Sequence, residues 1–170
     1  MINRIIFTAI STIWVWIVYG IQQRWTLPHV SIVMTAVIML SIPFFMTALW
    51  LLIARITFSN ENIDGVCFDI EEANNDFLPD YLGYFFIGIG VDDYKVMIMM
   101  FLIIFVFTLL SQRKLFNPLL LILGYNYYNV TTSNGVKVFI ISRKEIRDPG
   151  NVRLGNLRRI NNMSYIDFGR

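Results

Sequence analysis

The chain has 170 residues, of which 56% are hydrophobic and 15% are charged, and its mean hydropathy is +0.57. Because an average soluble domain carries about a quarter charged residues, this composition excludes an ordinary soluble domain and indicates a membrane protein. A single cysteine excludes an internal disulfide framework, a single histidine excludes a histidine-rich metal site, and we predict no metal and no cofactor.

The first apolar run, Ile5 to Ile21, contains 17 uncharged residues after Arg4. A cleaved signal peptide would show a small-residue cleavage site after this run, and none follows. We therefore predict that the run is an uncleaved membrane span.

The second apolar run, Val30 to Ala54, has 25 uncharged residues, and about 20 suffice to cross the hydrocarbon. Pro43 removes one backbone donor in its middle, so we predict a helix kink there, with Ser41 or a neighbouring helix bonding the freed groups. Only "QQRWTLPH" separates the two runs, which predicts antiparallel neighbouring helices.

Charge is distributed unevenly behind the net value of +2. Nine of the twelve acidic residues lie between Glu61 and Asp93, whereas ten of the fourteen Lys and Arg residues lie from Arg113 onward. We predict that the acidic segment 55–76 is a loop with some helix near "DIEEANNDF". Asn60 to Glu71 partly match the spacing of a calcium loop, but Asn replaces Asp at the first position and no flanking helix pair is evident. A solvated acidic loop is our interpretation.

The stretch Phe77 to Val91 decides the topology. Fifteen helical residues reach about 22 Å against a hydrocarbon core of about 30 Å. Lys and Arg near span ends favour the cytoplasmic side. If this stretch crosses, four spans put Arg4, Arg55 and the basic tail inside; if it does not, three spans put Arg4 and Arg55 outside. We predict a short third span, with a re-entrant or interfacial segment as the alternative. Three glycines in it should let a neighbouring helix approach closely: Gly83, Gly88 and Gly90.

The last long apolar run, Val96 to Leu110, is long enough to span if Tyr94, Lys95 and Ser111 are included. The Lys95 ammonium would then reach outward to water. We predict that this run is a further span.

After residue 114 the chain changes character, and its apolar run Leu119–Leu123 is too short to span. Asn134–Gly135, between two β-prone runs, predicts a hairpin in which both turn residues take positive φ. Three tyrosines are predicted to lie at the membrane interface, in the headgroup layer: Tyr125, Tyr127 and Tyr128. We predict a short helix further on, with Leu154, Leu157 and Ile160 on one side and Arg153, Arg158 and Arg159 exposed.

The predicted fold is an α-helical membrane protein with about four transmembrane helices, the third short or re-entrant, followed by a small cytoplasmic domain that contains a β-hairpin. The transmembrane domain covers residues 1–114 with the acidic loop 55–76, and the basic interfacial domain covers residues 115–170. We expect a multi-pass protein of the bacterial inner membrane with both termini in the cytoplasm.

No enzyme signature is present in the sequence, so we predict no catalytic residue. The polar residues inside the spans are hydroxyls, and the three firm spans carry no deep charge, which argues against a transporter. A pore built from several chains is the alternative. Positive charge in the tail is explained first by topology and by attraction to anionic lipid, and we expect no direct binding of nucleic acid.

The size, the four apolar segments and the tail "NPLLLILGYNYYNVTTSNGVKVFIISRK", Asn117 to Lys144, resemble the KwaA family, the membrane component of the Kiwa bacterial anti-phage defence system. The resemblance implies a homo-oligomeric, tetrameric membrane protein that senses phage infection at the envelope. It also implies a soluble DNA-binding partner, KwaB, held on the cytoplasmic side, and it brings no catalytic motif.

We therefore predict a non-enzymatic sensor and scaffold that oligomerises and recruits a soluble cytoplasmic effector; the alternative is a small oligomeric pore-forming effector or channel subunit. Two surfaces of opposite charge are predicted to attract each other or to bind the partner. The predicted partner-binding residues are Arg143, Lys144, Arg147, Arg153, Arg158 and Arg159 on the basic surface and Asp69, Glu71 and Glu72 on the acidic one.

Overall fold

The computed structural model describes residues 2–61, 67–76, 78–111, 116–132, 134–146 and 157–169. The chain forms two compact units, one made of Met1–Trp50 and Phe77–Gln112 and the other of Leu51–Asp76 and Arg113–Arg170. The last boundary between the two units, at Gln112–Arg113, lies close to the predicted boundary after residue 114. The acidic segment, however, belongs with the basic tail rather than with the helices, because it supplies strands to the same sheet.

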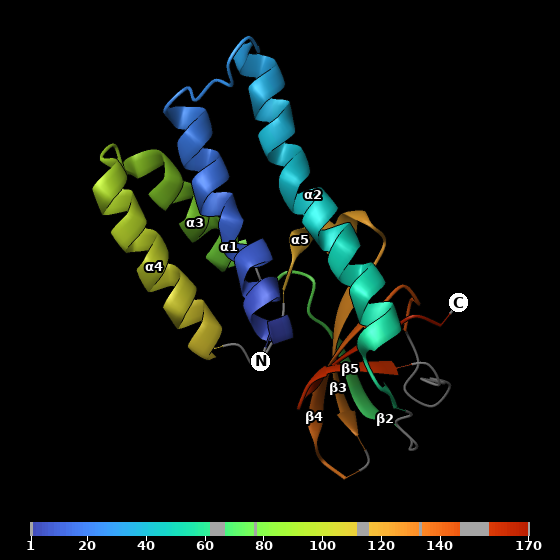
Figure 1. Cartoon of the computed structure of the whole chain (residues 1–170). Coiled ribbons are helices and arrows are strands. Elements are labelled where there is room, and N and C mark those ends of the chain that lie inside the picture. The colour runs from blue at the N-terminus through green and yellow to red at the C-terminus, as the bar shows by residue number, and fades with distance from the viewer. Residues whose placement is uncertain are drawn as a thin grey trace. The chain divides into compact units, whose positions relative to one another are not determined.

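Four helices follow the predicted apolar runs: α1 (Ile2–Gln22), α2 (Ile32–Thr57), α3 (Leu78–Gly90) and α4 (Tyr94–Ser111) (Figure 1). Two of the described helices, over Arg4–Gln22 and Ile32–Thr57, are long and apolar enough to cross a membrane. α3 has only 13 residues, or about 20 Å of helix, and the apolar part of α4, Tyr94–Leu110, is also shorter than a full span. The structure therefore shows two candidate spans rather than the predicted four.

In the helix unit, α1 packs against both α3 and α4. At one end, Arg4 Nη2 donates a hydrogen bond to the Leu110 carbonyl of α4 at 3.2 Å. At the other end, the Tyr19 hydroxyl donates to the carbonyl of Asp92, in the α3–α4 corner, also at 3.2 Å. α4 therefore runs antiparallel to α1 along its length, and the α3–α4 corner lies beside the C-terminal end of α1.

Close approach of α1 and α3 depends on one glycine. A Cβ atom added at Gly88 would lie 2.8 Å from Val18 Cβ and 3.0 Å from the Val15 carbonyl oxygen, whereas Gly83 and Gly90 have open space around them. The prediction that small residues allow a helix to approach is thus confirmed at Gly88 and wrong at the other two glycines, which lie away from the contact.

The hydroxyls of the long helices are used within the chain. Thr8, Thr12, Thr35 and Thr47 are buried. Each donates its hydroxyl proton to the carbonyl four residues earlier on its own helix, at 2.7–3.0 Å. This back-bonding satisfies a polar group without a partner helix, so these four hydroxyls need no water-filled path.

Pro43 lies inside α2, which continues through it as one helix. Proline frees the carbonyl four residues earlier, which is that of Met39. Ser41 Oγ instead donates to the Ile38 carbonyl at 2.7 Å. The expectation that Ser41 bonds the freed group is therefore wrong by one residue, because the short hydroxyl reaches the carbonyl three residues before its own.

The second unit is a six-stranded sheet with the strand order β1-β5-β6-β4-β3-β2. Its strands are β1 (Asn60–Glu61), β2 (Cys67–Glu72), β3 (Asn126–Thr132), β4 (Lys137–Ser142), β5 (Leu157–Asn161) and β6 (Ser164–Asp167). All neighbouring pairs are antiparallel except β4 and β6, which are parallel. The sheet joins residues that precede α3 to residues that follow α4.

The acidic segment is not the predicted loop with a helix. Its "CFDIEE" part is β2, paired with β3 in a register that sets Ile70 opposite Val130. The partial match to a calcium loop is not a calcium site, because Asn60 lies in β1 and Glu71 in β2, at opposite edges of the sheet. Within the described residues no group of acidic, Cys or His side chains is placed to hold a metal ion.

The predicted hairpin is confirmed between β3 and β4, with one correction to its turn. Gly135 has φ +75°, but Asn134 is not among the residues with positive φ. Gly135 N donates to the Thr132 carbonyl at 2.8 Å, and Thr132 N donates to Val136 O at 2.9 Å. These bonds close a loop one residue longer than the two-residue turn, and in such a loop only the glycine needs the left-handed conformation.

The predicted helix near the C-terminus is wrong where the structure describes it. Leu157 to Asn161 form β5, in which Leu157 is buried and Arg159 is exposed. Arg153 and Leu154 lie outside the described residues. A strand is formed because β1 and β6 pair with this segment on its two sides. β6 follows directly after a short turn, whereas β1 lies almost a hundred residues earlier in the sequence.

The three tyrosines predicted for the headgroup layer lie instead in the interior of the sheet unit: Tyr125, Tyr127 and Tyr128 are at most 4% exposed. The Tyr127 hydroxyl donates to the Asn117 carbonyl at 2.7 Å and accepts from Asn117 N at 2.8 Å. Asn117 Oδ1 in turn caps the short helix α5 (Pro118–Ile122) by accepting from Leu119 N. Burial raises the pKa of the Tyr127 hydroxyl far above its usual range, so it remains a donor.

Removal of this hydroxyl should loosen the sheet. We expect Tyr127→Phe to leave both backbone groups of Asn117 without that partner and to destabilise β3 and β4 by about 1–3 kcal/mol. Hydrogen–deuterium exchange of the amides over 126–142 measures the change. Tyr165→Phe is the matched control, because its hydroxyl has no hydrogen bond among the described residues. Equal exchange in the two variants would show that the Tyr127–Asn117 contact does not hold the sheet.

Candidate partner-binding surface

The acidic candidates lie on β2, which pairs with β3 and forms one edge of the sheet among the described strands. Ile70 points to the face that holds the core of Tyr128, Val130 and Ile140. Side chains alternate along a strand, so Asp69 and Glu71 share the opposite face, and both are exposed. The edge therefore presents two adjacent carboxylates next to backbone groups that no other described strand pairs with.

Glu72 is also exposed but has a local partner. Its Oε1 accepts a hydrogen bond from Asn74 Nδ2. Asn74 was missed by the sequence reasoning, yet its Oδ1 accepts from Tyr127 N at 2.8 Å, and Ala73 N donates to the Tyr127 carbonyl at 2.8 Å. These bonds tie the end of β2 to the start of β3. The only sequence signal for them was the turn-forming "ANND".

The basic candidates on the turn after β4 have partners within the chain. The Arg143 guanidinium lies over the Tyr125 ring, 4.5 Å from its centroid. Lys144 Nζ lies 3.9 Å from Oδ2 of Asp167, whose side chain is fully buried. Ser142 Oγ also donates to that oxygen at 3.1 Å. Burial raises the pKa of Tyr125, and the nearby Arg143 charge opposes that rise.

The basic candidates on β5 contribute to the structure of the sheet edge. Arg158 Nη1 donates to the Phe58 carbonyl at 2.6 Å, and Arg158 is the register partner of Asn60 in β1. Arg159 is exposed, and its guanidinium donates to the Asn161 carbonyl and to Asn162 Oδ1. The remaining two candidates, Arg147 and Arg153, lie outside the described residues.

The described charges on β2 and on β5 lie far apart within one chain. β5 and β2 are four strand positions apart in the sheet, which is roughly 19 Å at about 4.8 Å per step. The structure therefore brings Asp69 and Glu71 together but separates them from Arg158 and Arg159. An attraction between the β2 carboxylates and these two arginines would have to act between chains.

The chain has apolar helices, two of them long enough to cross a membrane, and a small sheet with charged residues. These features define a class of small helical proteins with a folded polar domain. The family model described as "Anti-phage protein KwaA" matches residues 3–166 of this chain. The chain belongs to the KwaA family and has a role in anti-phage defence. Comparisons with curated proteins and with solved structures gave no match.

Proposed function

We propose that this protein is a non-enzymatic sensor and scaffold of the bacterial inner membrane, which oligomerises and holds a soluble, KwaB-like DNA-binding effector on its cytoplasmic side. The observation that carries the proposal is the pairing of two strands that lie on either side of the α3–α4 hairpin in the sequence. β2 precedes α3 and β3 follows α4, and the two strands pair directly. The segments before and after the α3–α4 hairpin therefore lie on the same side of any membrane that the hairpin enters.

This pairing supports an even number of crossings over a three-span arrangement. If α4 crossed and α3 did not, β2 and β3 would lie on opposite sides and could not pair. The corner of the hairpin also lies beside the end of α1, because the Tyr19 hydroxyl and Gln23 Nε2 both donate to the Asp92 carbonyl at 3.2 Å. A hairpin that reaches the far end of α1 supports four crossings, the third made by a short helix.

The orientation follows from the basic residues. Ten of the fourteen Lys and Arg residues lie from Arg113 onward, and Lys and Arg near span ends favour the cytoplasmic side. With the sheet unit inside, an even number of crossings also puts the N-terminus in the cytoplasm. The sheet unit is then the part of the protein that a soluble effector can reach.

Within the sheet unit, we place the recruiting surface at the β2 edge. The described basic candidates are engaged in contacts with their own chain, whereas Asp69 and Glu71 are exposed and share one face. A DNA-binding effector carries basic surface, which complements two carboxylates at an edge strand. Reversal of Arg158 is not a clean test of recruitment, because its guanidinium bonds the Phe58 carbonyl within the fold.

The test is the double variant Asp69→Lys/Glu71→Lys in the full-length protein. We expect it to insert in the membrane, to lower capture of the co-expressed effector by about tenfold or more, and to abolish protection in a plaque assay, because like charges at an interface repel. Affinity capture from solubilised membranes measures recruitment. Arg159→Glu reverses an exposed charge on β5, four strand positions away from β2, and should have a small effect.

The results of these two variants show whether the effector binds at the β2 edge or at β5. Wild-type capture and protection by the Asp69→Lys/Glu71→Lys protein would exclude the β2 edge as the recruiting surface. Loss of both in Arg159→Glu alone would place the surface on β5 instead.

A further inference from the structure

A cavity of about 610 Å³ lies at the end of the helix unit, where α1, the α1–α2 loop and the α3–α4 corner meet. Its size is within the range of small-molecule sites. Four aromatic rings, two carboxylates and one amide line it: Trp16, Tyr19, Trp25, Tyr94, Asp92, Asp93 and Gln23. Neither the predicted sites nor the proposed function uses this cavity.

The aromatic wall is fixed by the way α1 ends. Trp25 N donates to the Gly20 carbonyl at 2.9 Å and Arg24 N donates to the Ile21 carbonyl at 3.1 Å, with Arg24 at φ +54°. This is a Schellman helix end, here with arginine rather than glycine in the left-handed position, a conformation that costs free energy in a non-glycine residue. It folds Trp25 back over Gly20, where an added Cβ would meet the indole at 3.0 Å.

The folded-back ring completes a cluster. The Trp25 centroid lies 6.2 Å from that of Trp16 and 5.6 Å from that of Tyr19, and the Trp16 and Tyr19 centroids are 5.8 Å apart. The three rings support each other, so the wall is present before any ligand arrives. Their faces offer a π surface that attracts cations.

The acidic wall is held by hydrogen bonds that leave its charge in place. Gln22 Nε2 donates to Asp92 Oδ1 at 3.3 Å, and Asp93 Oδ1 accepts from the backbone N of Lys95 and of Val96, which caps α4. Within the described residues, neither carboxylate forms a salt bridge. One basic group lies beside the cavity: Lys95 Nζ is 6.0 Å from the Tyr94 ring centroid.

We propose that this cavity binds an organic ammonium group, carried by a lipid headgroup or by a free amine, between the aromatic wall and the two carboxylates. The two walls both favour a cation. The aromatic rings attract it through their quadrupoles, and the carboxylates attract it by their negative charge. An apolar ligand would not compensate the charge of either carboxylate. In the orientation proposed above, the cavity opens on the outer face of the membrane. Only the side from which the ligand enters rests on that proposed function.

The test uses choline as the probe, titrated against the full-length protein in detergent and followed by tryptophan fluorescence. We expect saturable binding of choline and binding about tenfold weaker, or weaker still, of 3,3-dimethyl-1-butanol, its neutral isostere. The two sources of ammonium are separated in lipid nanodiscs. Competition with choline by phosphatidylethanolamine, relative to phosphatidylglycerol alone, assigns the site to a lipid headgroup, and its absence assigns it to a free amine.

Two variants localise the site. Asp92→Asn/Asp93→Asn removes the charge while asparagine keeps the helix cap, and Trp25→Leu removes one ring; each should weaken choline binding about tenfold. Phe86→Leu, at an aromatic residue 72% exposed on α3, is the control and should leave it unchanged. Equal affinity for the neutral isostere, or unchanged choline affinity in the asparagine variant, would overturn the proposal. Effector capture by the same variants tests the scaffold function separately.

Discussion

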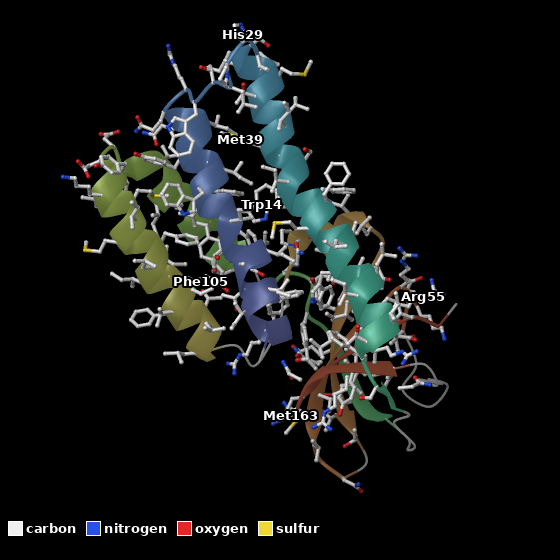
Figure 2. All side chains as sticks on the ribbon, in the orientation of Figure 1. Trp14, His29, Met39, Arg55, Phe105 and Met163 are labelled. Atoms are coloured by element: carbon white, nitrogen blue, oxygen red, sulfur yellow. The ribbon has the colours of Figure 1, made fainter. Side chains whose placement is uncertain are left out.

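A thiol reagent that cannot cross membranes should label a cysteine at position 26 in spheroplasts and should fail to label one at position 163. The variants are Thr26→Cys and Met163→Cys, each in a Cys67→Ser background. Thr26 lies in the loop between α1 and α2, and Met163 lies in the turn between β5 and β6. Figure 2 labels Met163 and His29, which is in the same loop as Thr26. α2 has 26 residues, about 39 Å of helix, so the two sites lie on opposite sides if it crosses.

A third cysteine distinguishes four crossings from a re-entrant hairpin. Gly90 ends α3 and has open space where a side chain would project. Gly90→Cys should be labelled from outside at a rate similar to that of Thr26→Cys, because the α3–α4 corner lies beside the end of α1. Labelling of Met163→Cys in sealed spheroplasts would refute the proposed orientation. Protection of Gly90→Cys together with labelling of Thr26→Cys would leave α3–α4 as a re-entrant hairpin.

Gly88→Ala should destabilise the helix unit by about 1–3 kcal/mol, the usual cost of forcing extra volume into a close contact. The new Cβ would lie 2.8 Å from Val18 Cβ and 3.0 Å from the Val15 carbonyl oxygen. Neither atom is the far end of a flexible side chain, so α1 and α3 have to move apart. Unfolding in a denaturing detergent series, followed by tryptophan fluorescence, reports on this unit because all four tryptophans lie in Met1–Trp50.

Gly83→Ala is the matched control on the same helix. No atom lies within 4 Å of the position of its Cβ, and alanine is favoured over glycine in a helix interior by about 1 kcal/mol. We therefore expect Gly83→Ala to be neutral or stabilising. A Gly88→Ala protein as stable as the Gly83→Ala protein would mean that α1 and α3 do not pack at the distance described.

The sequence by itself determined the features that depend on local composition. Apolar runs of sufficient length predicted α1, α2 and α4, including the addition of Tyr94, Lys95 and Ser111 to the last of these. Asn134–Gly135 predicted the β3–β4 hairpin, because a turn needs only its own few residues. The tail and the overall layout also predicted the family that the comparison confirmed.

Tertiary structure alone decided the sheet. Leu157 to Asn161 have the spacing of a short helix, and "DIEEANNDF" is acidic like a surface helix, yet both segments contribute strands. Distant partners pair with them, β1 with the first segment and β3 with the second. The tyrosines at 125, 127 and 128 have the composition of a headgroup belt, but burial in the sheet and the bonds to Asn117 and Lys144 explain them. Likewise, the cavity exists only because a helix end folds Trp25 back toward Asp92. Pairing across tens of residues leaves no local pattern, which is the physical reason that the sequence could not predict it.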